Sequence, residues 1–318
     1  MRLGIPLIFV LVVAGIAGLS ISFEPGSIAY SLGGPPWLLS LDEGSLGVVY
    51  LKHGFSNGID RSAVFYGVVN TGGLWTAGPT PVSPPNRPGP PGAIGPAGIV
   101  ARIDERRLVH IAWALWDSER DDLSFHYVQL DPNGTVRAWT GPLANFTVPF
   151  VYSSVHLGIR VLLDEIQIVF PANGAANGTH MVTTLNLMGQ IRSPPSLATG
   201  LDNASYFPLR QFPPGVSAAT NEVLDSDASL VSDGPTTYYL WVNGRQWFEG
   251  RTYRSEMDLQ FYRESPSGNV SRVLDSTEDG WWLTKPAVLP SLLSLVAAVS
   301  GTTVLMWHHF RQRKSKRS

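Results

Sequence analysis

The chain has 318 residues, enough for one large domain or two ordinary ones, and its 44% hydrophobic content excludes a disordered protein. It contains no cysteine, which excludes disulfides, zinc–thiolate sites and thiol catalysis. Its 32 glycines and 25 prolines, with no long amphipathic helical pattern in the middle, predict many short strands joined by turns.

The chain begins with an export pattern. Arg2 precedes the uncharged, almost wholly apolar stretch Leu3–Leu19, and small residues follow it. This order is typical of a secretory signal sequence. We predict that residues 1–22 are a signal peptide, or a signal anchor if they are not cleaved.

A second hydrophobic segment lies near the other end. Pro286–Trp307 is 22 residues without a charge, long enough to cross a hydrocarbon core of about 30 Å as a helix. The tail after it carries five cations: Arg311, Arg313, Lys314, Lys316 and Arg317. Positive residues stay on the cytoplasmic side of a membrane. We therefore predict a transmembrane helix over 285–307, a cytoplasmic tail over 308–318, and an extracellular domain over 23–280.

The predicted extracellular part is acidic. Arg2 and the five tail cations are six of the 23 basic residues, so 17 basic residues face 25 acidic ones, a net charge of about −8. This charge argues against nucleic acid as a partner. The lack of cysteine in an outer domain is more typical of a prokaryotic surface protein than of an animal one.

Four stretches of the middle region repeat one strand pattern. A run such as VHIAWAL (109–115) is followed by a run such as LSFHYVQL (123–130) and by a glycine turn such as DPNG (131–134). The matching second runs elsewhere lie at 47–51, 166–170 and 238–242. Each unit therefore predicts four antiparallel strands, at a period of roughly 55 to 75 residues, which is typical of propeller blades.

Over residues 37 to 275 the units resemble the sialidase-like (BNR-type) β-propeller repeats of archaeal and bacterial surface proteins. The resemblance rests on the elements I-x-W/Y-x, F-x-Y-x-x-L and D-x-x-G-x-V, and the Asp-box turn of that family is absent. It implies an all-β propeller with four visible blades. A fifth would lie in 196–228 or be completed from 21–36. A β-sandwich is the alternative fold class.

The loops fall into two classes in this scheme. Tight turns follow the first and third strands, and long loops follow the second and fourth, at 52–61, 74–98, 116–122, 140–156, 171–179, 193–228 and 243–257. Because binding residues are usually carried by loops on a rigid frame, we expect the long-loop face to be the binding face. Both linkers to the chain ends leave from the same face.

Two of these loops carry candidate ligands. An acidic cluster, Asp117, Glu119, Asp121 and Asp122, is a weak candidate for a hard cation, with a solvated hairpin loop as the alternative. The stretch 243–257 is a weak candidate for an acidic sugar, with local ion pairs as the alternative. Its candidate residues are Arg245, Trp247, Glu249, Arg251, Tyr253 and Arg254.

Other residues fit structural roles. We expect His110 and His126 to pack or hydrogen-bond within strands, and Trp113, Trp116, Trp139 and Trp241 to lie in the core. No hydrolase elbow, metalloprotease motif or phosphate-binding glycine loop occurs, so we expect no cofactor. Five glycosylation sequons lie between the hydrophobic ends, at Asn133, Asn145, Asn177, Asn203 and Asn269.

The sequence thus predicts a membrane-anchored cell-surface protein that binds a glycan or another surface protein and has no evident catalytic chemistry. A sialidase-like glycoside hydrolase and a structural envelope component are the alternatives.

Overall fold

The computed structural model describes the backbone of residues 29–42, 44–56, 59–60, 63–83, 87–88, 94–117, 122–147, 155, 157–172, 179–201, 206, 228–249 and 252–282. The predicted signal segment, transmembrane helix and basic tail lie outside these residues. Among the residues that are described, no helix is long and apolar enough to cross a membrane. The chain divides into two compact units, and the sheets described below lie in the larger one, Ser27–Trp247 with Ser255–Asp279, apart from strand residues 248–249, 252–254 and 280–282.

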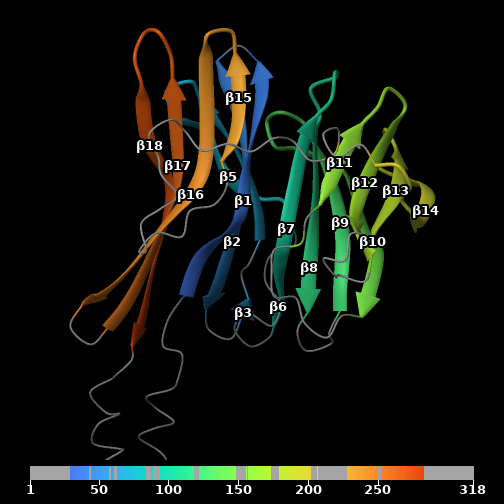
Figure 1. Cartoon of the computed structure of the whole chain (residues 1–318), viewed down its shortest axis with the longest axis horizontal. Helices are drawn as coiled ribbons and strands as arrows, with labels where there is room; N and C mark the ends of the chain where they lie inside the picture. Colours follow the sequence, from blue (N-terminus) through green and yellow to red (C-terminus); the bar gives the residue numbers. More distant parts are fainter. Residues whose placement is uncertain are drawn as a thin grey trace, which may run out of the picture. The chain divides into compact units, whose positions relative to one another are not determined.

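The described strands form four separate antiparallel sheets, each made of strands that follow one another in the chain (Figure 1). The first sheet contains β1 (Ala29–Asp42), β2 (Ser45–Ser56), β4 (Ala63–Asn70) and β5 (Trp75–Pro81), with the short β3 (Ile59–Asp60) and β6 (Arg87–Pro88) at one side. The second contains β7 (Ile94–Ile103), β8 (Val109–Asp117), β9 (Asp122–Leu130) and β10 (Val136–Thr147).

The third sheet contains β11 (Gly158–Val161), β12 (Glu165–Pro171), β13 (His180–Asn186) and β14 (Ile191–Leu197). The fourth contains β15 (Ser229–Asp233), β16 (Thr236–Glu249), β17 (Thr252–Glu264) and β18 (Val270–Trp282). The predicted repeat of four-stranded units is confirmed, and the fold is a propeller-like all-β arrangement. The sandwich alternative is wrong, because the strands form four sheets rather than two.

The turn between the third and fourth strands is closed by the same backbone hydrogen bond in every sheet. The glycine amide donates to the carbonyl three residues earlier in the pairs Gly73–Asn70, Gly134–Asp131, Gly189–Asn186 and Gly268–Ser265, at 2.9 to 3.0 Å. All four glycines have positive φ, which residues with a Cβ adopt with strain. The glycine turns recognised in the sequence therefore make the units equivalent in three dimensions.

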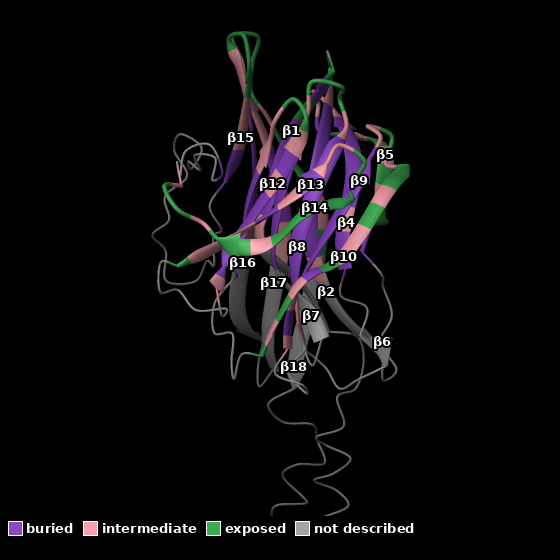
Figure 2. Ribbon diagram, turned by 90° about the vertical axis from the view of Figure 1, so that its right-hand side faces the viewer, coloured by how far each residue is buried: buried purple, intermediate pink, exposed green. Residues whose placement is uncertain are grey.

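The sheets stack face on face. One face of the first sheet, with Leu39, Val49 and Tyr66, shares a core cluster with the second and third sheets. Its other face, with Leu38, Val48 and Tyr50, packs against Leu240, Phe261 and neighbouring residues of the fourth sheet. The first and last sheets of the chain are therefore neighbours in space. Figure 2 shows buried residues along the strand middles and exposed ones at the turns.

Two parts of the strand prediction are wrong. The stretches 74–98 and 140–156 were expected to be loops, but β5 and β6 lie in the first, β7 begins inside it at Ile94, and β10 continues to Thr147. The stretch 243–257 was also expected to be a loop, but β16 continues to Glu249 and β17 begins at Thr252. The outer strands β5 and β14 lack a clear strand pattern because they are mostly exposed and contain prolines, which edge strands tolerate.

Candidate functional site

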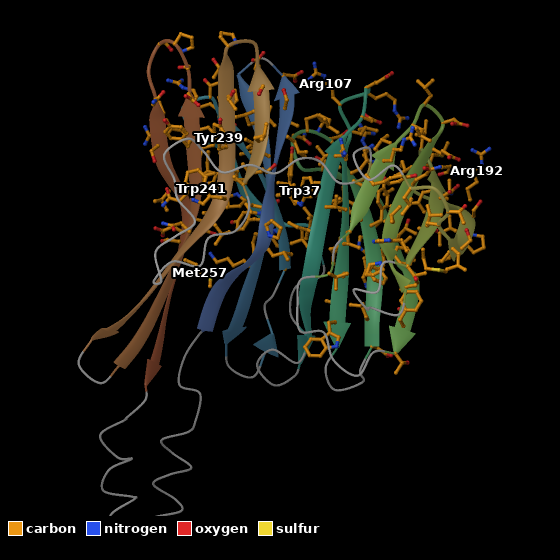
Figure 3. All side chains as sticks on the ribbon, viewed as in Figure 1. Trp37, Arg107, Arg192, Tyr239, Trp241 and Met257 are labelled. Atoms are coloured by element: carbon orange, nitrogen blue, oxygen red, sulfur yellow. The ribbon has the colours of Figure 1, made fainter. Side chains whose placement is uncertain are left out.

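A cavity lies where the first strands of three sheets meet. It has a volume of about 220 Å³ and is lined by Trp37, Leu38, Leu39 and Ser40 of β1, Ala101, Arg102 and Ile103 of β7, and Ser229, Leu230 and Val231 of β15. Two hydrogen bonds tie these strands together. The Trp37 indole donates to the Ile99 carbonyl at 2.9 Å, and the Leu38 amide donates to the Ser229 hydroxyl oxygen at 3.0 Å. Figure 3 labels Trp37 on β1.

Seven of the ten lining residues are apolar, and polar atoms supply a large share of the accessible lining. Arg102 is the only charged residue among the ten, and Ser40 and Ser229 add two hydroxyls. Burial lowers the pKa of Arg102, yet a guanidinium remains protonated at neutral pH. An apolar cavity with a small number of placed polar groups is the usual composition of a small-ligand site. Its volume is below the 300 Å³ or so of a drug-sized pocket.

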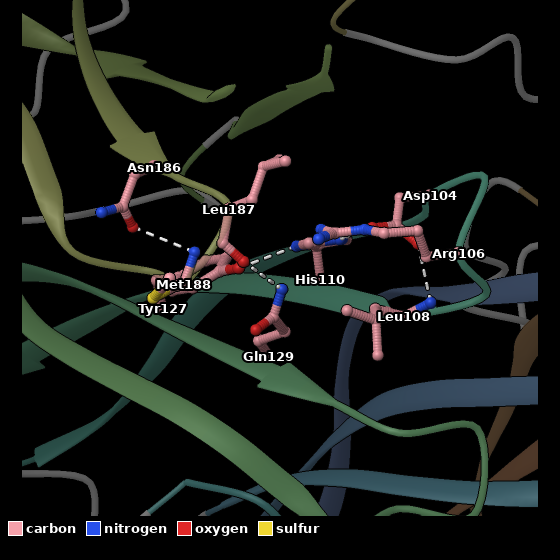
Figure 4. Close-up of polar contacts among 9 residues, drawn as sticks. All are labelled: Asp104, Arg106, Leu108, His110, Tyr127, Gln129, Asn186, Leu187 and Met188. Carbon is pink, nitrogen blue, oxygen red and sulfur yellow. Dashed lines mark hydrogen bonds and ion pairs between the residues drawn. The ribbon is translucent and has the colours of Figure 1, made fainter. Parts of the chain in front are cut away.

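The cavity borders a buried polar network at one end of the second sheet (Figure 4). Arg102 on β7 is the cross-strand partner of His110 on β8. One His110 ring nitrogen lies 2.7 Å from the Tyr127 hydroxyl, and the other lies 3.3 Å from a carboxylate oxygen of Asp104. Asp104 also accepts hydrogen bonds from the Leu108 amide at 2.8 Å and from the Arg106 guanidinium at 2.9 Å. Asp104 thus holds the turn that follows β7 and orients His110.

Burial and charge shift the pKa values in this network. Burial lowers the pKa of His110, and it outweighs the nearby Asp104 carboxylate, which acts in the opposite direction. Burial by itself would raise the pKa of Asp104, but the Leu108 amide, Arg106 and His110 together hold that pKa below its ordinary value. Burial also raises the pKa of the Tyr127 hydroxyl. The network is therefore a neutral imidazole between a phenol and a carboxylate at neutral pH.

The cavity lacks the groups that hydrolysis of a glycosidic bond requires. Such hydrolysis generally uses two carboxyl groups about 5 to 10 Å apart. None of the ten residues that line the cavity is Asp or Glu. Asp104 lies two residues beyond Arg102, but its carboxylate is occupied by Leu108, Arg106 and His110.

The predicted acidic cluster lies only partly within the described residues. Asp117 and Asp122 face each other across the β8–β9 hairpin, while Glu119 and Asp121 lie outside the described residues. Across the described residues there is no group of three or more His, Asp or Glu residues that could hold a metal ion.

The second candidate set, in 243–257, lies on a hairpin. Arg245, Trp247 and Glu249 belong to β16, and Tyr253 and Arg254 belong to β17. Arg251 and the side chains of the whole set lie outside the described residues. Their role as ligands stays a prediction.

The histidine predictions are confirmed, because His110 and His126 are buried within strands. Trp113 and Trp241 are buried as predicted, and Trp116 is partly buried. Trp139 is not a core residue, because 46% of it is exposed. The sequons at Asn133, Asn145 and Asn269 are exposed, and those at Asn177 and Asn203 lie outside the described residues.

The cavity residues were not singled out from the sequence. Ser40, Arg102 and Ser229 lie far apart in the chain and belong to ordinary strand patterns, so only the packing of first strands brings them together. The one local signal was Asp104 in the sequence IDERRL, where a carboxylate opens a tight turn and can bond its own backbone.

No protein-family model matches the chain, and no curated protein matches it. Among solved structures it is similar to the α-L-arabinanase of Penicillium chrysogenum, with 9% identity over 77% of this chain and 65% of that one, at a TM-score of 0.32. An ulvan lyase of polysaccharide lyase family 25 is 15% identical over 75% of this chain and 54% of that one, at a TM-score of 0.32.

The β-fructofuranosidase BmSUC1 of Bombyx mori is 11% identical over 83% of this chain and 56% of that one, at a TM-score of 0.30. The chain thus spans less than two thirds of the length of each of these three proteins. All three TM-scores are below 0.5.

Proposed function

We propose that the protein is a membrane-anchored binding protein of the cell surface, with an extracellular β-propeller that takes a small ligand without cleaving it. The observation that supports this most is the cavity between β1, β7 and β15, because its lining offers one cation, two hydroxyls and apolar surface but no carboxylate. A group of this size and polarity fits one unit of a glycan or envelope polymer.

We also propose that the four sheets are blades of a propeller. The first sheet packs on both the second and the fourth, so the two ends of the domain meet as they do in a closed ring. We expect a BNR-like propeller of a prokaryotic, archaeal-type surface protein. The two hydrophobic ends of the sequence support the cell-membrane location, with the bulk of the chain outside.

Membrane orientation is tested by protease protection of the full chain in sealed vesicles. With the outer side exposed, protease should remove residues 23–280 and leave a small membrane-protected fragment that contains 285–318. Digestion of the basic tail from the outer side would contradict the proposed orientation.

Binding is tested with the full chain in detergent on a glycan array, followed by assay of reducing ends. We expect saturable binding that Arg102→Met weakens, with no new reducing ends. New reducing ends would favour the glycoside hydrolase. Absence of binding, together with ordered arrays of the protein in membranes, would favour the structural envelope component.

A further inference from the structure

Trp139 is an unusual surface residue of the second sheet. It lies on the edge strand β10, and 46% of it is exposed. Among the six tryptophans whose side chains the structure describes, Trp139 is the only exposed one. A tryptophan side chain offers roughly 150 to 250 Å² of surface, so about 100 Å² of flat apolar indole faces solvent here.

The exposed indole is the outer member of a row of three rings. The rings of Trp113 on β8 and His126 on β9 are stacked, with centroids 5.5 Å apart and planes at 16°. The Trp139 ring follows on β10, with its centroid 5.9 Å from that of His126 and its plane tilted by 32°. Trp113 is 1% exposed, so the row runs from the core to the surface.

The middle ring is held in place from two sides. A ring nitrogen of His126 lies 2.9 Å from the Ser124 hydroxyl oxygen. On the other side, Gly141 packs so closely that a Cβ at that position would overlap the imidazole. Because His126 is buried and fixed, the Trp139 ring that contacts it is held by a rigid neighbour, which lowers the entropy that binding would cost.

A charged pair lies close to Trp139 in the sequence. Arg137 precedes Trp139 by two residues on β10, and its guanidinium bonds both carboxylate oxygens of Asp131 at 2.8 Å. The Arg137 side chain is 62% exposed. Its remaining N–H groups and the carboxylate lone pairs can bond hydroxyl groups of a ligand.

We infer that Trp139 is a carbohydrate-stacking site, with the ring row as its base and the Asp131–Arg137 pair as its polar neighbour. A pyranose has an apolar C–H face that can lie on an indole and equatorial hydroxyls that can bond a charged pair. A second protein is the less fitting ligand, since stable protein interfaces bury about 1,000 Å² or more, and Trp139 and Val136 are the exposed large apolar residues of β10. The site is separate from the cavity, whose lining does not include Trp139.

The test is affinity electrophoresis of the detergent-solubilised full chain in gels that contain hydroxyethyl cellulose or yeast mannan. The wild type should be retarded by at least one of the two polymers. Trp139→Ala should weaken that retardation about two- to tenfold, the range expected for loss of one aromatic contact. Trp139→Tyr keeps an aromatic ring and should retain most of it.

Leu163→Ala is the matched control, because Leu163 is a large apolar side chain in the turn between β11 and β12 that is 83% exposed. It should migrate like the wild type. Thermal melting of each variant shows whether it is folded, and Trp139→Tyr provides the comparison if Trp139→Ala is not. Equal retardation of Trp139→Ala and wild type, or no retardation of the wild type by either polymer, would overturn the inference.

The glycan of this chain's own Asn133 is the competing occupant, because that sequon lies on the turn before β10. Asn133→Gln, produced in a glycosylating host, separates the two cases. Unchanged retardation of Asn133→Gln relative to the wild type supports an external glycan. Retardation that occurs only in Asn133→Gln would mean that the attached glycan covers Trp139, and it would overturn the inference. None of these measurements involves Arg102. A negative result for Trp139 would therefore not contradict the proposed ligand site in the cavity.

Discussion

At the scale of single residues, His110 combines full burial with two polar partners. Its side chain is inaccessible to solvent, and it lies between the Asp104 carboxylate and the Tyr127 hydroxyl. A buried imidazole avoids the charged form, and this is why burial lowers the pKa of His110 below its ordinary 6.5. The charged and titratable groups around it are Asp104, Arg106 and Tyr127, with Arg102 opposite on β7.

This pKa shift predicts a pH dependence of stability. Between the lowered folded pKa of His110 and about 6.5, the unfolded chain binds a proton that the folded chain does not. The free energy of unfolding should therefore fall as pH drops below about 6.5. Asp104 acts in the same direction at lower pH, because its folded pKa is lowered and its stabilising effect is lost as it becomes protonated.

The measurement is urea unfolding of the wild type and His110→Gln between pH 7.5 and 5. We expect a smaller loss of stability with falling pH in His110→Gln, because the variant lacks the group that the folded state keeps neutral. All other titratable groups are common to both proteins. The readout is therefore the difference between the wild type and His110→Gln in how steeply the free energy of unfolding falls with pH. Identical slopes would show that His110 does not control this dependence.

At the scale of elements, glycines decide how closely neighbouring segments approach. Gly98 on β7 packs against the backbone of Val155, which precedes the third sheet, and a Cβ at position 98 would overlap the Val155 carbonyl oxygen. Backbone cannot move aside as the end of a flexible side chain can. The close approach of β7 to this segment therefore depends on the glycine.

Gly98→Ala should destabilise the domain by about 1 to 3 kcal/mol, the usual cost of forcing extra atoms into a packed interior. Gly78→Ala is the matched control, because Gly78 also lies in a strand and has no atom within 4 Å of its added Cβ. Thermal or urea unfolding of both variants measures the difference. A Gly98→Ala variant as stable as Gly78→Ala would mean that Val155 is free to shift.

At the scale of the whole domain, one carboxylate links β18 of the fourth sheet to β2 of the first. Asp275 on β18 accepts a hydrogen bond from the Tyr50 hydroxyl at 2.8 Å and pairs with the Lys52 ammonium at 2.9 Å. The Lys52 and Asp275 side chains are 22% and 20% exposed, so water screens this pair only in part. The Trp75 indole also donates to the Leu274 carbonyl, which brings β5 and β18 together.

Asp275→Ala should therefore cost about 2 kcal/mol, because it leaves a buried phenol and a half-buried ammonium without their shared acceptor. Asp164→Ala removes an exposed pair with Arg192, whose side chains are 76% and 55% exposed, and should cost less than about 1 kcal/mol. Urea unfolding at low and high salt compares them. Equal small costs for both variants would show that Asp275 does not hold the first and fourth sheets together.

The sequence by itself determined which segments become inner strands and where they turn. Alternating β-branched and aromatic runs such as 109–115 and 123–130, each bounded by a glycine turn, are local signals, because strand propensity and positive φ depend on adjacent residues. For the same reason the burial of His110, His126 and Trp113 could be predicted from their places within strands.

Only the tertiary structure decided which strand faces meet and what lies between them. Trp113 and Trp139 occupy similar strand patterns, but the first lies on a central strand and the second on an edge strand, and so only the first is buried. The cavity likewise joins Ser40, Arg102 and Ser229 from three sheets. Such contacts depend on long-range packing, because residues almost 200 positions apart become neighbours only after each sheet has buried its faces against the next.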